Sequence, residues 1–149
     1  IRIKLKSFEY NLVDKSSVNT KKVEETIRSE IKPFVNVPIV FISSLTKQRI
    51  FKALETGVNV YNNRKRKIVT RKLNDKLLPI ITKNPPPSLK GKYVKIKFCT
   101  QLPTSYPQFA FYCNLPQYVK EPYKRFIENK LRELYDFEGV PITIFFRKK

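Results

Sequence analysis

The apolar residues in the second half of the chain follow helical and strand spacings in turn. Leu73 and Leu77 recur at the four-residue period of a helix face, whereas the apolar residues around Ile96 alternate with lysines, as in a strand. The first two strands are expected to be antiparallel, and the order predicts a compact α+β module over residues 70–149 with a three-stranded sheet. The expected helices run from Thr70 to Pro85 and from Tyr118 to Asp136, and the expected strands cover residues 92–100, 108–114 and 140–147.

The first half of the chain predicts an alternation of strands and helices over residues 1–69. Ile1–Lys6 alternates apolar and basic residues, and Val37–Ser43 is apolar on both faces, as in a buried parallel strand. One helix is expected over Lys21–Lys32, where a proline ends it, and a second over Gln48–Asn63. The apolar face of the second helix consists of Ile50, Phe51, Leu54, Val58 and Tyr61.

Basic residues outnumber acidic ones throughout the chain. The sequence has 31 Lys and Arg against 12 Asp and Glu, a formal net charge of +19. Both halves share the excess, with 15 basic against 6 acidic residues over 1–69 and 16 against 6 over 70–149. A surplus of this size repels itself and favours an anionic partner, most simply a phosphate backbone. Because 41% of the residues are hydrophobic, the chain can build a core, which argues against a disordered basic arm.

The cations that are candidates for RNA contacts fall into three groups. One run follows the second helix and faces either RNA or a neighbouring domain, a second group lines a turn and a strand, and a third opens the long helix beside Tyr118 and Tyr123. Cations there meet phosphates and tyrosine rings stack on unpaired bases, although the spacing of Tyr123 favours the core. The groups are Arg64, Lys65, Arg66 and Lys67; Lys90, Lys92, Lys95 and Lys97; and Lys120, Lys124 and Arg125.

The sequence offers few groups for catalysis or metal binding. It has no His, so Ser-His and Cys-His pairs are excluded, and Cys99 and Cys113 alone cannot complete a zinc site. Both cysteines are expected to be buried thiols, with a disulfide between them as the alternative. None of the 3 glycines belongs to a G-x-x-x-x-G-K-[ST] phosphate loop. We therefore expect no catalytic residue, metal or cofactor in this chain, and no membrane-spanning helix, since no apolar run approaches about 20 residues.

Several runs that follow one another in order carry a resemblance to a known family. The runs are 38–46 (PIVFISSLT), 84–87 (NPPP), 90–92 (KGK), 100–101 (TQ), 123–133 (YKRFIENKLRE) and 137–142 (FEGVPI). In these runs the chain resembles the C-terminal part of Der (EngA), a family of ribosome-assembly GTPases with two Ras-like GTPase domains and a KH-like domain. The resemblance implies a KH-like α-β-β-α-β module over residues 70–149 and a truncated remnant of the second GTPase domain over residues 1–69.

The resemblance also marks a remnant of a nucleotide site. Ser43, Ser44 and Leu45 match the last guanine-binding motif of the family, with Ser44 in the place of the usual Ala. We interpret these residues as vestigial, because the chain lacks the phosphate loop and the switch regions that hold GTP and Mg²⁺ in the parent family. The chain alone is therefore not expected to be an enzyme.

Residues 1–17 fit that family poorly and resemble the start of small-subunit ribosomal protein ten. Where the guanine-specificity motif N-K-x-D is expected, Phe8, Glu9 and Asn11 take the Asn, Lys and Asp positions. This substitution predicts a chimera with its junction between Phe8 and Ser17. A start at Ile1 and the absence of Met predict a processed chain or a piece of a longer one.

The leading prediction is an RNA-binding module of a cytoplasmic GTPase that acts in biogenesis of the large (50S) ribosomal subunit. It is expected to bind ribosomal RNA by phosphate and shape contacts, because the chain lacks the G-x-x-G loop with which KH domains grip nucleotides. Packing against missing GTPase domains, or self-association, is also expected. The alternatives are a component of the small ribosomal subunit and a partial view of an intact, GTP-hydrolysing Der.

Overall fold

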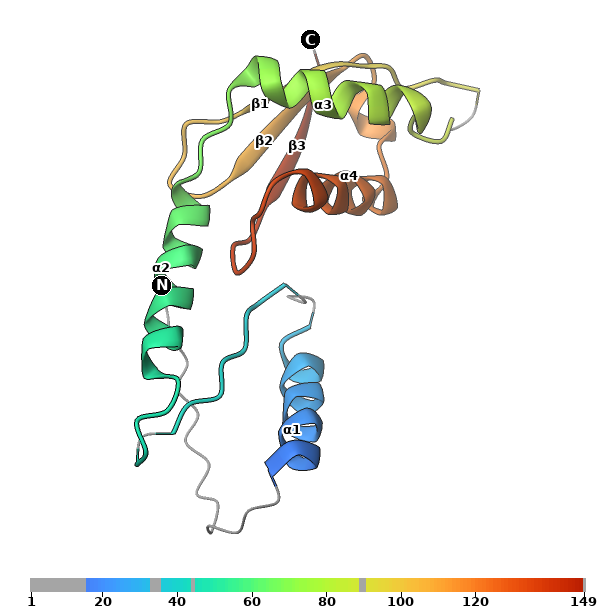
Figure 1. Cartoon of the computed structure of the whole chain (residues 1–149). Helices are drawn as coiled ribbons and strands as arrows, with labels where there is room; N and C mark the ends of the chain where they lie inside the picture. The colour runs from blue at the N-terminus through green and yellow to red at the C-terminus, as the bar shows by residue number, and fades with distance from the viewer. Residues whose placement is uncertain (1–15, 33–35, 44, 89–90, 149) are drawn as a thin grey trace.

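The structure is a computed structural model that describes residues 16–32, 36–43, 45–88 and 91–148 (Figure 1). Two helices precede a small sheet that is covered by two more. In chain order the elements are α1 (Ser16–Glu30), α2 (Ile50–Lys65), α3 (Thr70–Lys83), β1 (Ile96–Gln101), β2 (Gln108–Cys113), the short 3-10 helix η1 (Pro116–Tyr118), α4 (Glu121–Leu134) and β3 (Thr143–Lys148).

The sheet has the strand order β1-β2-β3. β1 and β2 are antiparallel, as expected, and β2 and β3 are parallel. The prediction of an α+β module with a three-stranded sheet is therefore confirmed, although each strand and helix begins or ends a few residues away from its expected bounds. β1 begins late because the side chain of Asn114 takes the place of a ladder partner: it accepts from the Lys95 N–H at 2.8 Å and donates to the Tyr93 carbonyl at 2.9 Å.

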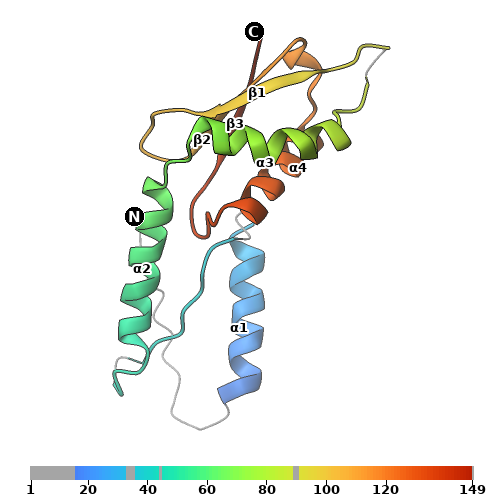
Figure 2. The same ribbon diagram turned by 45° about the horizontal axis from the view of Figure 1, so that its top comes forward.

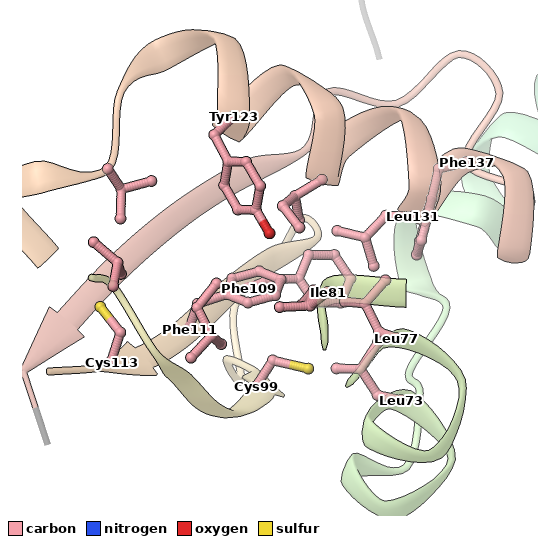
Figure 3. Close-up of a cluster of buried hydrophobic side chains, with 14 residues drawn as sticks. Leu73, Leu77, Ile81, Cys99, Phe109, Phe111, Cys113, Tyr123, Leu131 and Phe137 are labelled. Atoms are coloured by element: carbon pink, nitrogen blue, oxygen red, sulfur yellow. The ribbon is translucent and has the colours of Figure 1, made fainter. Parts of the chain in front are cut away.

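A single apolar core lies between the sheet and the helices α3 and α4 (Figure 3). The helical spacings place one side chain of every turn inward, and the strand alternation supplies the facing layer. Burying each of these large side chains stabilises the fold by about 1.5–3 kcal/mol relative to leaving it in water. The buried residues are Leu73, Leu77 and Ile81 from α3, Cys99 from β1, Phe109, Phe111 and Cys113 from β2, and Tyr123, Ile127 and Leu131 from α4.

The outer edge of β1 is closed by one side chain from α3. The carboxamide of Asn74 accepts from the Cys99 N–H at 2.8 Å and donates to the Cys99 carbonyl at 2.8 Å. A neighbouring strand would make the same pair of bonds, so Asn74 satisfies backbone groups that a sheet edge otherwise leaves to water. It also fixes where α3 lies along β1.

The first part of the chain differs from its prediction. Residues 37–43 form no strand, and their side chains are half-buried or exposed rather than buried, so the expected strand at Val37–Ser43 is wrong. A parallel strand requires a neighbour for its backbone groups, and no described strand lies beside this segment. Helix α1 also begins at Ser16, ahead of the expected Lys21. The strand expected at Ile1–Lys6 lies outside the described residues.

Helix α2 stands apart from the core of the module (Figures 1 and 2). Its apolar stripe faces water: Phe51 is 85% exposed and Leu54 63% exposed, and Val58 and Tyr61 are exposed as well. The helix was placed correctly by its spacing, but the spacing alone did not say whether a partner covers the stripe.

Candidate nucleic-acid interface

A basic groove lies where α2 meets the loop between β1 and β2. Its volume is about 570 Å³. One wall is the end of α2 and the segment after it, and the other is the loop that follows β1. The lining residues are Tyr61, Arg64, Lys65, Arg66, Lys67, Ile68, Gln101, Leu102, Pro103, Thr104 and Ser105.

The side chain of Gln101 holds the two walls together. Its Nε2 donates to the Arg66 carbonyl at 2.9 Å, and its Oε1 accepts from the Ile68 N–H at 2.7 Å. The Nε of Arg64 adds a third link by donating to the Ser105 carbonyl at 3.0 Å. These bonds fix the backbone of the basic run, so its cations are presented from a defined segment and not from a free linker.

The electrostatics of the groove favour an anion. No Asp or Glu lines it, and no described salt bridge involves the basic run from Arg64 to Lys67. The Nζ of Lys65 lies 4.5 Å from the centre of the Tyr61 ring, so the cation is held over an aromatic face without being neutralised. Since like charges repel, four adjacent cations are most stable when phosphate or another anion lies among them.

The groove adjoins a contact between α2 and the module. Asn63 is the one residue before position 70 that is buried in the described chain, and its Nδ2 donates to the Glu138 carbonyl at 3.3 Å. The Gly139 N–H donates to the Asn36 carbonyl at 2.7 Å. Gly139 has φ +74°, and a Cβ there would lie 2.5 Å from Cγ2 of Val60. Glycine is therefore needed both for the turn and for the close approach of α2.

The cations near the start of α4 lie beside the turn that precedes β1. The Nζ of Lys92 donates to the Tyr118 hydroxyl at 3.1 Å and lies over the same ring, which ties this turn to η1. Lys124 forms an ion pair with Glu121, whereas Lys120 and Arg125 are exposed. Of this set, Lys124 is thus partly neutralised and Lys92 is positioned by an aromatic partner.

Tyr123 belongs to the core and not to this surface. Its ring is buried, and its hydroxyl donates to the Asn84 carbonyl at 2.8 Å. Burial raises the pKa of Tyr123 to about 12. The spacing argument that favoured core packing for this residue is confirmed.

The predicted site residues do not form one patch. The side chain of Lys97 is exposed within β1, and Lys92 and exposed Lys95 lie before the start of that strand. The groove lies at the opposite end of β1, next to Gln101. A strand of this length spans about 20 Å, so an RNA would have to follow β1 to touch both ends. Lys90 lies outside the described residues, and the role of all these cations in RNA binding stays a prediction.

The expected guanine-motif remnant forms a turn. The Ser43 N–H donates to the Gln48 carbonyl at 3.2 Å, and the Ser43 hydroxyl accepts from the Thr46 N–H at 3.3 Å. Leu45 is 80% exposed, and Ser44 lies outside the described residues. Neither Ser43 nor Leu45 lines the basic groove.

The two cysteines are free and buried, as expected. Burial raises the pKa of the Cys99 thiol to about 12 and also raises that of Cys113. Both thiols therefore stay protonated at neutral pH, whereas a cysteine nucleophile would need to be ionised. Within the described ranges no group of three or more His, Cys, Asp and Glu residues is placed to hold a metal ion.

Sequence reasoning missed the residues that hold the groove and the neighbouring α2 contact in place. Gln101 stood out only as part of the run Thr100-Gln101, and Asn63 only as the expected end of a helix. Both act through side-chain bonds to distant carbonyls, at Arg66 and Glu138. A polar residue at the end of an amphipathic helix or strand is a weak signal for such a bridge, because the same residue is ordinary on a solvated surface.

The fold defines a KH-like α+β domain preceded by two helices. Residues 67–147 match the model of the family described as KH-domain-like of EngA bacterial GTPase enzymes, C-terminal. This match covers more than half of the chain, and the chain belongs to that family. The resemblance drawn from the sequence runs is thereby confirmed.

Curated relatives agree with this placement. The chain is 67% identical over 141 residues to a GTPase Der of Christiangramia forsetii, which covers 95% of this chain and 32% of the relative. It is 59% identical over 141 residues to a GTPase Der of Flavobacterium psychrophilum, with the same shares. A GTPase Der of Phocaeicola vulgatus is 57% identical over 143 residues, covering 95% of this chain and 33% of the relative. The chain thus spans about a third of the length of these relatives.

The relatives bear on one further expectation, the fusion near the start of the chain. Since 95% coverage leaves fewer than 17 residues unmatched, the similarity to Der reaches into the segment 1–17 that resembles a ribosomal protein. The fusion itself stays a prediction, and residues 1–15 lie outside the described part of the chain.

Among the helices of the described residues, none combines the length and the apolar character that a membrane crossing requires.

Proposed function

We infer that this chain is the RNA-binding C-terminal module of a bacterial, cytoplasmic GTPase that acts in biogenesis of the large ribosomal subunit. The observation that carries the proposal is the basic groove between α2 and the loop after β1, which presents four adjacent cations without a carboxylate. Family membership supports an association with a GTPase, and the net charge of +19 supports a polyanionic partner.

The proposed mode of binding is recognition of phosphates and shape. The cations of the groove would contact successive phosphates of structured ribosomal RNA, with the arginine side chains able to bridge two phosphate oxygens. Because the segment is held by Gln101 and Arg64, the cations keep a fixed spacing that a helical RNA backbone can match. The turn at Lys92 and the start of α4 would supply a second, separate set of contacts.

GTP binding and hydrolysis are proposed for a longer protein that includes this chain, and not for these 149 residues alone. The relatives that carry the name GTPase are about three times as long. None of the 3 glycines here lies in a phosphate-loop motif. Labelled GTP retained by the isolated chain would contradict this division of roles.

The test is a salt titration of binding to large-subunit ribosomal RNA. The variant Lys65→Gln/Lys67→Gln removes two exposed cations of the groove. Among the described residues, neither lysine side chain takes part in the hydrogen bonds that hold the groove together. The matched control Lys21→Gln/Lys22→Gln removes two exposed cations from α1. If both groove lysines contact phosphates, the slope of log affinity against log salt falls in magnitude by about 1.4–1.8. The control slope stays at the unmodified value.

Two outcomes would overturn the proposal. Binding of the unmodified chain that does not weaken with salt would exclude phosphate recognition. An equal loss of slope in the α1 control would show that general charge, and not the groove, attracts the RNA.

A further inference from the structure

One face of the sheet is left open by the helices. Strand alternation sends Cys99, Phe109 and Phe111 into the core, between the sheet and α3 and α4 (Figure 3). Both helices lie on this side of the sheet (Figures 1 and 2). The residues that alternate with the core positions therefore point to the opposite side. The pairing registers place them in two rows, Phe98–Tyr112–Arg147 and Thr100–Ala110–Phe145.

The open face, defined by Lys97, Phe98, Tyr112, Phe145 and Arg147, is aromatic and cationic. The rings of Phe98 and Tyr112 are stacked, with centroids 4.4 Å apart and planes 13° apart. Phe145 is 38% exposed, and Arg147, opposite Tyr112 in the register, is exposed too. The register shift between Ile96 and Phe98 marks a bulge, so Lys97 lies next to Phe98 on the exposed side.

The charge of this face is of one sign. The strands β1, β2 and β3 read IKFCTQ, QFAFYC and TIFFRK and contain no Asp or Glu. A partner that fits must therefore be anionic and must also offer flat apolar surfaces to the aromatic rings. An acidic protein segment has flat rings only where it contains aromatic residues, whereas every nucleotide of an unpaired nucleic-acid strand supplies both a charge and a flat base.

We propose that the open face stacks unpaired bases of an RNA strand on Tyr112 and Phe145, with Lys97 and Arg147 contacting the flanking phosphates. This deepens the proposed function, on which it rests, since it adds a single-strand site to the phosphate contacts of the groove. Stacking on aromatic rings is tolerant of base identity because every base has a π-face. The face therefore selects unpaired over paired RNA and not one sequence over another.

The proposal separates the two surfaces of the molecule by the RNA that each prefers. The groove contacts phosphates, which duplex and single-stranded RNA both carry. The open face needs exposed bases, which only the single strand offers. The experiment therefore compares a short oligouridine with a blunt RNA duplex of the same phosphate count, using the full 149-residue chain.

The test variant is Tyr112→Leu/Phe145→Leu, which removes two rings and keeps apolar side chains. The matched control is Phe51→Leu, at an exposed phenylalanine of α2. The double variant should bind oligouridine about tenfold more weakly than the unmodified chain does, and the duplex as before, since each lost ring removes one stacking contact with a base. The control should bind both RNAs like the unmodified chain. If the double variant bound oligouridine as tightly as the unmodified chain does, the proposal would be overturned.

A second measurement covers the case in which the double variant fails to fold. Oligouridine carrying 5-iodouridine is crosslinked by light to the unmodified chain, and the linked peptides are identified by mass spectrometry. Crosslinks to Tyr112 or Phe145 support the open face. Crosslinks confined to other segments overturn it, and they would leave the face to a protein partner.

The failures of the two proposals are distinguishable. If the chain binds neither RNA, the proposed function itself fails. If Lys65→Gln/Lys67→Gln weakens the binding of both RNAs while Tyr112→Leu/Phe145→Leu changes neither, the groove stands and only the open face fails.

Discussion

The module from α3 to β3 and the segment that contains α1 and α2 use the same kinds of apolar spacing with opposite results. In the module, Leu77, Phe109 and Ile127 are 0% exposed. In the first segment, only Asn63 is buried among the described residues, and the apolar stripe of α2 faces water. Sequence spacing therefore specifies which side chains share a face, but burial depends on whether another element of the chain reaches that face.

The difference in burial between the two regions goes together with how much of its relatives' length this chain spans. The relatives are about three times as long as this chain, and the family model covers only residues 67–147. An exposed stripe that includes Phe51 and Leu54 is costly in water, since large contiguous apolar patches are unusual on single soluble domains. Substitutions in the two regions should therefore differ in their effect on the free energy of unfolding.

The largest effect is expected from truncating a core leucine. Leu77→Ala should lower the free energy of unfolding by about 2–5 kcal/mol, because it leaves a cavity under α3. The same change at exposed Leu54 should alter it by less than about 0.5 kcal/mol. Urea unfolding followed by circular dichroism measures both. A similar cost at the two positions would mean that a partner, such as a second copy, covers α2 in solution.

A smaller effect is expected where the two regions touch. Gly139→Ala should cost at least about 1–2 kcal/mol, because its positive φ disfavours a Cβ and the new methyl group would overlap Val60. Adding Val60→Ala should recover the part that comes from the overlap and leave the backbone strain. Thermal unfolding of the single and double variants separates the two terms. An unchanged midpoint for Gly139→Ala would mean that α2 does not dock on this turn.

The smallest effect concerns the alkaline limit of the module. Because burial raises the pKa of Tyr123 to about 12, the folded state holds the phenolic proton more tightly than the unfolded state, whose pKa is about 10. Stability is therefore full below pH of about 10 and falls as the pH rises toward about 12. Tyr123→Phe should lower the free energy of unfolding by about 1 kcal/mol at neutral pH, because it removes the hydrogen bond to the Asn84 carbonyl. Between pH of about 10 and 12, the free energy of unfolding of this variant should fall less steeply than that of the unmodified chain.

The raised pKa of Cys99 acts in the same direction, so Cys99→Ala serves as the control for the thiol. The unfolding free energy at several pH values is compared among the unmodified chain and both variants. An identical alkaline slope for Tyr123→Phe and the unmodified chain would contradict the assignment.

Most of the module could be predicted from sequence. In its helices the apolar residues recur every three or four positions on one face, as at Leu73 and Leu77. In its strands apolar and polar residues alternate, so the type of each element and the core residues followed directly from the sequence. The strand expected at Val37–Ser43 failed for a physical reason: apolar character on both faces fits a strand only when neighbours pair with it. That information is not contained in the local pattern.

The candidate site was predicted less completely. The cations of the groove were named because four adjacent basic residues are visible in any sequence. Their separation from Lys92 and the start of α4 was not foreseen, since it depends on which end of β1 each group adjoins. Gln101 escaped notice because its role is to join two backbone segments that are far apart in the chain.

The carboxamide of Asn74 has a consequence for how molecules of this chain meet one another. A β-strand from another molecule that approached the outer edge of β1 would find the donor and acceptor of Cys99 already occupied. Growth of fibril-like assemblies by strand addition needs such free pairs, and here one neutral amide withholds them. One neutral side chain therefore blocks strand addition at Cys99, and it does so independently of the positive charge that keeps like molecules apart.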